Sequence, residues 1–224
     1  MIKRKAFITK YWSYYMMLEE RFIKTMQFVE LCPDNKDAYS NEYASLLMSI
    51  GAEVDCLFKL NCGFEPNEKK CISDYVTLEP LVKPWKIELL DRDLDPLAPF
   101  GEWNSDSPGK SLKWWQAYNA IKHSRGDNRE CGSQQNVLDS LAGLCLLESL
   151  MLKRISQKYS CKDVPSEYSK LFYIDGWEYN STPYNKYETS IPLHLDRDNE
   201  EDRALVDALK NFGLEGDLFD PPDE

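Results

Sequence analysis

The chain has 224 residues and a formal net charge of -11, from 27 Lys and Arg against 38 Asp and Glu. Hydrophobic residues make up 42% and charged residues 29%, which is typical of a globular protein and too apolar for a disordered one. The acidic balance excludes a protein that coats duplex DNA through bulk charge, because such binding depends on many Lys and Arg contacts to phosphates. The length fits one generous domain or one domain with an appendage.

The simple counts also exclude several kinds of site. No segment has the roughly 18 uninterrupted apolar residues of a membrane-spanning helix, and no signal-peptide cleavage site follows the basic residues Lys3 to Lys5. The chain has 7 cysteines and 2 histidines, with no CxxC pair, so we expect no zinc or other metal and no cofactor. A cysteine–histidine nucleophile pair is a minor alternative. We expect a cytoplasmic protein with no membrane partner.

Four segments repeat apolar residues every three or four positions, the period of a helix with one buried face. The first is predicted from about Ala6 to Leu31, and the second from about Ser40 to Leu60 with Gly63 after its end. The third runs from about Pro108 to Arg125, with Ser107 as its N-cap. The fourth, about Gln134 to Tyr159 with Ser133 as its cap, is apolar around so wide an arc that we expect it to be central.

These helices predict an all-α fold, an up-and-down bundle of four main helices in residues 1–160. The connection 61–106 contains five prolines, so we expect it to be extended or turning, with a short helix near Glu68 to Tyr75. Residues 161–224 form an irregular Tyr/Pro-rich and acidic extension, with a short strand near Leu171 to Ile174 and a helix across Glu200 to Phe212.

The charge is divided unevenly along the chain. Residues 191–224 hold 11 acids and 3 bases, a net charge of -8, which leaves only -3 for the other 190 residues. Residues 107–130 hold 5 bases and 2 acids. We therefore predict a small basic site at the end of the third helix, which the acidic segment from Asp196 shields; a merely solubilising tail is the alternative.

The third helix carries the residues best suited to chemistry. Trp115, Asn119 and His123 follow one another at spacings of four on one face. An imidazole with a pKa of about 6.5 exchanges protons at neutral pH, and the cations Lys122 and Arg125 are suited to hold a phosphate. Asn119 would orient the histidine or the substrate. The alternative is structural: cations in a last turn complement the helix dipole, and tryptophans anchor cores.

Two carboxylates fall on apolar helix faces, Glu53 in the second helix and Glu148 in the fourth. A buried carboxylate is costly unless it is paired, so we expect each to meet a cation or donor, with Lys122, His123 and Arg125 as candidates. The alternative is that they reach water at the edge of the face. Together with Tyr118, Trp115 and Arg129, we take them as candidate binding residues.

The pattern Trp115-x-x-Tyr118-Asn119-x-Ile121-Lys122-His123-x-Arg125 resembles the motif region of the HEPN superfamily, as does the earlier helix that carries Glu53. HEPN proteins are small helical bundles, many of them dimeric, metal-independent ribonucleases and others non-catalytic RNA- or nucleotide-binding modules. The resemblance implies His123 as the catalytic histidine and Asn119 as the polar residue of the motif. The family's arginine, four to six residues before the histidine, is missing; Tyr118 occupies that place, and Lys122 and Arg125 are the candidate substitutes.

Two functions follow as hypotheses. The first is an RNA-directed protein of a defence or toxin type, either a ribonuclease or an RNA-binding module, acting as a homodimer. The second is a non-catalytic dimerisation or interaction scaffold, whose Tyr- and Pro-rich segment from Tyr168 to Tyr187 contacts a protein partner.

Overall fold

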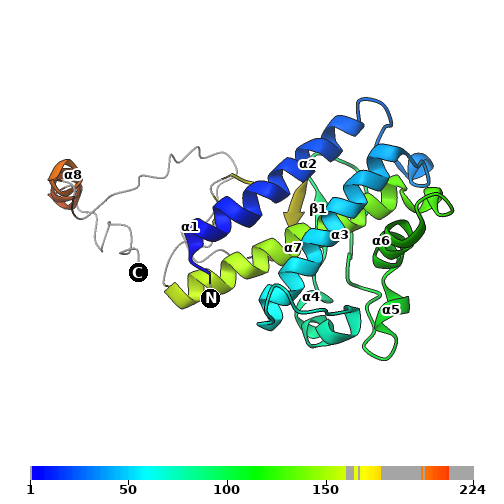
Figure 1. The fold of residues 1–224 in the computed structure, drawn as a ribbon. Coiled ribbons are helices and arrows are strands. Elements are labelled where there is room, and N and C mark those ends of the chain that lie inside the picture. The colour runs from blue at the N-terminus through cyan, green and yellow to red at the C-terminus, as the bar shows by residue number, and fades with distance from the viewer. Residues whose placement is uncertain (1, 160–163, 166, 178–197, 199, 212–224) are drawn as a thin grey trace.

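The computed structural model describes residues 2–159, 164–165, 167–177, 198 and 200–211, and within them the chain is mostly helical (Figure 1). The elements in chain order are α1 (Arg4–Phe7), the π-helix η1 (Ile8–Trp12), α2 (Ser13–Thr25), η2 (Pro33–Asn35), α3 (Asn41–Cys62), η3 (Ile72–Leu78), α4 (Glu79–Val82), β1 (Ile87–Leu89), α5 (Pro108–Ser111), α6 (Lys113–Ser124), η4 (Arg129–Cys131), α7 (Gln134–Tyr159), β2 (Phe172–Ile174) and α8 (Glu200–Asn211). The all-α class is thus supported, apart from one two-stranded sheet.

The first predicted helix is shorter than its apolar pattern. Continuous helix ends at Thr25 instead of Leu31, and residues 4–25 include the π-helical turn η1. The Thr25 hydroxyl donates to the Phe22 carbonyl at 2.6 Å, and the next two amides, those of Met26 and Gln27, bond to carbonyls only three residues back. The threonine hydroxyl thus bonds to a backbone carbonyl of the last helical turn, and the chain leaves the helix after Thr25.

The central helices match their predicted bounds closely. The Ser40 hydroxyl accepts the Tyr43 amide at 3.0 Å and caps α3, and Gly63 ends it in the left-handed conformation, with φ 75°. The Ser133 hydroxyl accepts the Asn136 amide at 3.3 Å at the start of α7. Helix α7 packs against α3, α2 and α6 and is buried through most of its length, so the prediction of a central helix is confirmed.

The third predicted helix is divided in two. Leu112 separates α5 from α6 in an extended conformation, with φ -100° and ψ 105°. Its side chain is buried, so this break places an apolar residue in the core that a continuous helix would orient differently. Ser107 caps nothing with its side chain, contrary to prediction; α5 is a single turn.

The proline-rich connection covers one side of the core. Its predicted short helix is a 3₁₀-helix that starts later, at Ile72, because the Asp74 carboxylate accepts the Cys71 amide at 2.8 Å and caps the turn there. Tyr75 and Trp103 are fully buried and pack against Phe58 of α3. The connection also contributes β1, which pairs antiparallel with β2.

A buried carboxylate joins the segment before β2 to α2. Glu19 is fully buried and accepts the Tyr15 hydroxyl at 2.6 Å, the Lys170 amide at 2.9 Å and the Ser169 hydroxyl. These three donors satisfy a group that would otherwise be costly to bury. The strand predicted near Leu171 is present, and α8 matches the predicted acidic helix within one residue.

Half of the segment predicted to contact a partner, and much of the acidic segment predicted to shield the basic site, lie outside the described residues. In the part of the chain that the structure describes, every helix is too short or too polar to cross a membrane.

Candidate functional site

Two aromatic residues of the predicted motif belong to the core. Trp115 is buried, with its ring centroid 5.7 Å from that of Phe58 and 5.2 Å from that of Tyr118. Tyr118 lies directly against Gly51 of α3, where even a methyl group would overlap its ring. Burial, followed by the charge of Asp55, raises the pKa of Tyr118. Both residues therefore fix α6 against α3, and neither is placed to bind a ligand at the surface.

No hydrogen bond joins the side chains of the motif's polar residues to one another among the described residues. The Asn119 side-chain NH2 donates to the Trp115 carbonyl of its own helix at 3.0 Å. The side chain of His123 is exposed. Lys122 lies over the Tyr118 ring, 5.4 Å from its centroid, a cation–π contact. The contacts that Asn119 and Lys122 form are therefore with Trp115 and Tyr118 of their own helix.

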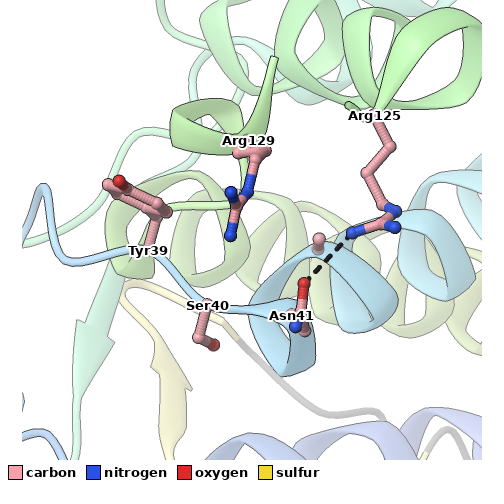
Figure 2. Close-up of a pocket in the computed structure, with 6 residues that line it drawn as sticks. Tyr39, Ser40, Asn41, Arg125 and Arg129 are labelled. Carbon is pink, nitrogen blue, oxygen red and sulfur yellow. Dashed lines mark hydrogen bonds between the residues drawn. The ribbon is translucent and has the colours of Figure 1, made fainter. Parts of the chain in front are cut away.

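Arg125 and Arg129 do come together, in an open pocket of about 280 Å³ at the start of α3 (Figure 2). Its other lining residues are Tyr39, Ser40, Asn41 and Ala44. Arg125 donates to the Asn41 side-chain oxygen at 3.1 Å, and Arg129 lies between Tyr39 and Arg125. A second hollow of about 320 Å³ shares Asn41, Ala44 and Arg125 and extends along α3 to Met48.

The close approach of two backbones builds this pocket. Gly132, just after η4, lies on Ala44, and a Cβ at Gly132 would be 2.9 Å from the Ala44 Cβ. The Ser40 amide donates to the Gly132 carbonyl at 3.3 Å, and the Gln134 amide to the Ala38 carbonyl at 2.9 Å. The loop that carries Arg129 is therefore held against the N-terminus of α3.

The pocket is electropositive. Within the described residues neither arginine forms an ion pair. Glu42, at the start of α3, pairs with Arg21 at 2.7 Å, and Asp127 accepts the Ser124 hydroxyl at 2.5 Å. Glu130, next to Arg129 in the chain, is exposed. The first amides of α3 add the positive end of a helix dipole. Such a surface has the chemistry to bind a phosphate, with guanidinium groups as bidentate donors.

The sequence indicated half of this pocket. Arg125 and Arg129 were predicted as site residues, and Ser40 was expected only at the start of its helix. Tyr39 and Asn41 were missed, because nothing local shows that residues 126–133 fold back onto the start of α3. The one available signal was Gly132, a small residue in a loop with no other evident need for glycine.

The two predicted carboxylates lie away from the cations. Glu148 is fully buried, and neither of its oxygens has a hydrogen-bond partner among the described residues, so the expectation of a cation partner is wrong. Glu53 is half-buried and forms no ion pair within that part of the chain. Burial, followed by the charge of Glu53, raises the pKa of Glu148 well above its usual range, and burial raises the pKa of Glu53.

Tyr11, in the π-helical turn, belongs to the same cluster: burial and the charges of Glu53, Cys56 and Glu148 raise its pKa. Among the described residues no group of three or more His, Cys, Asp or Glu side chains is arranged to hold a metal ion.

Comparisons with protein-family models, with curated proteins and with solved structures find no match for this chain.

Proposed function

We propose that this protein binds RNA through a phosphate site formed by Arg125 and Arg129. The carrying observation is the pocket at the start of α3, which two guanidinium groups line without an ion pair in the described part of the chain. The chain has a net charge of -11, so acids outnumber bases. Two cations that line one pocket without an ion pair in the described part of the chain are therefore not explained by the composition. The motif that resembles HEPN is the reason to expect RNA as the source of the phosphate.

The finer fold prediction belongs to the same proposal. We infer that α2, α3, α6 and α7 correspond to the four main helices of an up-and-down bundle, with the phosphate site at the end where α3 begins and α6 ends. Sites in helical bundles are commonly built from residues on facing helices.

Removing both charges is expected to weaken RNA binding at least tenfold. In Arg125→Gln/Arg129→Gln the long polar side chains remain, but the charge that a phosphate needs is gone. Fluorescence anisotropy with a labelled single-stranded RNA at several salt concentrations measures the effect. The slope of log K against log salt should also become shallower by about 0.7, because the two arginines neutralise one phosphate and each phosphate neutralised on a single strand contributes about 0.7.

The matched control is Lys86→Gln/Arg92→Gln, which removes the same charge from exposed residues that line neither hollow. Its affinity should stay within about twofold of the unmodified protein. Equal losses in the two double variants would mean that bulk charge, not the pocket, attracts RNA, and unchanged binding in the arginine variant would refute the phosphate site.

We infer binding without cleavage, because Asn119 is bonded to its own helix and His123 has no oriented partner among the motif residues. Unmodified protein and His123→Ala are therefore expected to give the same background when incubated with structured RNA and resolved on a gel. Cleavage that depends on His123 would instead support the ribonuclease hypothesis, with Lys122 and Arg125 as its phosphate ligands.

The interaction scaffold remains the alternative, in which the two tryptophans serve only the core. Trp114 and Trp115 are both buried, and the Trp114 indole donates to the Pro99 carbonyl at 2.7 Å. A dimer is predicted for both functions, and a protein partner is predicted for the scaffold. Sedimentation equilibrium tests the homodimer directly, and a scaffold would show no RNA binding in the anisotropy experiment.

A further inference from the structure

Tyr39 presents an exposed aromatic ring on a fixed backbone. The residue is 55% exposed, although its backbone forms an isolated antiparallel bridge with Ser133. The amides of Ser40 and Gln134 bond across this bridge on either side. A ring held in this way loses little conformational freedom when a ligand covers it, which favours binding.

The ring stands at the edge of the phosphate pocket. Tyr39 lines the same open space of about 280 Å³ as the two arginines, and Arg129 lies between Tyr39 and Arg125 (Figure 2). No ring contact or cation–π contact occupies Tyr39 within the described residues. The pocket therefore combines an exposed aromatic ring with two cations that line the same space.

This combination is the chemistry of a nucleotide rather than of a bare anion. An inorganic phosphate would use the arginines and leave the aromatic ring unexplained, whereas a nucleotide places a flat base next to its phosphate. Stacking of bases on aromatic side chains, together with a cationic track for the backbone, is how proteins bind single strands. Bases inside a duplex are already stacked on each other and present only their edges.

We propose that the pocket takes one nucleotide of a single-stranded RNA, with its base stacked on Tyr39 and its phosphate held by Arg125 and Arg129. This inference rests on the proposed phosphate site and adds strand specificity to it. The adjoining hollow, which runs along α3 to Met48, gives the strand a direction in which to leave the pocket.

Variants of Tyr39 test the stacking. Tyr39→Leu keeps an apolar side chain but removes the π-face, and Tyr39→Phe keeps the face and removes the hydroxyl. The probes are a labelled single-stranded RNA and a duplex of the same length, measured by anisotropy. We expect Tyr39→Leu to weaken single-strand binding about tenfold, which corresponds to the loss of one stacked base. Its affinity for the duplex should not change. Tyr39→Phe should bind both probes as the unmodified protein does. Because the ring is exposed, both variants should keep the unmodified circular dichroism spectrum and Tm.

A second readout uses a single strand with one 2-aminopurine, whose fluorescence is quenched on stacking; quenching should occur with the unmodified protein and Tyr39→Phe and be lost in Tyr39→Leu. If Tyr39→Leu binds single strands as tightly as the unmodified protein while Arg125→Gln/Arg129→Gln does not, the stacking proposal is wrong and the phosphate site stands. If Tyr39→Leu weakens single strand and duplex equally, strand specificity is also refuted. If neither variant changes binding, the proposed function itself fails.

Discussion

Gly51→Ala is expected to lower the free energy of unfolding by about 2 kcal/mol, although alanine is the better helix former. In α3 the change gains about 1 kcal/mol of helix propensity. Against this, the new methyl carbon would lie 2.3 Å from Cδ2 and 2.5 Å from Cγ of the Tyr118 ring, a severe overlap in a packed interior. Overpacking costs about 1–3 kcal/mol and occasionally more. An overlap this severe puts the cost at the upper end, about 3 kcal/mol, which leaves a net loss of about 2 kcal/mol after the gain in helix propensity.

The ring cannot easily yield. Tyr118 is buried, with Trp115 beside it and Lys122 over its face, so α6 must shift away from α3. Thermal unfolding followed by circular dichroism should show a Tm lower by about 4–8 °C, the usual scale for about 2 kcal/mol in a chain of this size. RNA affinity should fall as well, because Arg125 follows directly after α6 and would move with it.

A control and a double-mutant cycle make the cause specific. Gly126→Ala adds the same methyl where nothing lies within 4 Å, and its stability should change by less than about 0.5 kcal/mol. Combining Gly51→Ala with Tyr118→Leu should be less destabilising than the sum of the two single changes, by about 1 kcal/mol. Additive effects would mean that the methyl and the ring do not meet.

The sequence predicted the long helices well because their signals are local. Apolar periodicity, the Ser40 cap and Gly63 set the bounds of α3, and the wide apolar arc of α7 correctly placed it at the centre. The early end of α2 and the break at Leu112 were missed, because neither is set by periodicity. The end of α2 depends on one hydroxyl, that of Thr25, and the break at Leu112 depends on burial of its side chain in the core. The role of the connection in covering the core was missed for the same reason: prolines predict its backbone, not its packing.

The candidate site was predicted less completely. Helical spacing places Asn119 and His123 on one face. A polar side chain in a helix can also bond to a backbone carbonyl four residues back, and Asn119 donates to the Trp115 carbonyl in this way. The pocket instead joins two arginines of one segment to the start of a distant helix, since Arg125 and its partner Asn41 are 84 residues apart in sequence. Only the fold brings these segments together.

Among the described residues, Glu148 is the only ionisable side chain with buried polar atoms that lack a hydrogen-bond partner. It is fully buried among the apolar residues of α7, and neither of its oxygens is satisfied there. The ionisable groups that act on it or are influenced by it come from three elements: Glu53 of α3, Tyr11 of η1 and Cys145 of α7. With no cation among them, burial and the neighbouring carboxylate both favour the protonated form.

This predicts a stability that falls as the pH rises. A carboxyl whose pKa is higher in the folded than in the unfolded chain binds more protons when folded, so stability is greatest below the unfolded pKa of about 4.5 and is lost as the pH rises through the folded value. Asp139 acts in the same direction, since burial raises its pKa to about 6 in spite of a hydrogen bond from Gln135. Glu148→Gln should remove the contribution of Glu148 alone.

At pH 8 we expect Glu148→Gln to be more stable than the unmodified protein. At pH 4.5 the two should be nearly equal, because an amide and a protonated carboxyl are similar in size and polarity. Glu148→Met should be more stable at both pH values, since it also removes the unsatisfied polar atoms. Urea unfolding at the two pH values measures these differences, with Glu88→Gln, an exposed residue of β1, as the control that should change neither. A gain for Glu148→Gln that is the same at pH 4.5 and pH 8 would contradict the raised pKa, because the carboxyl would then carry the same charge in the folded and unfolded chain at each pH.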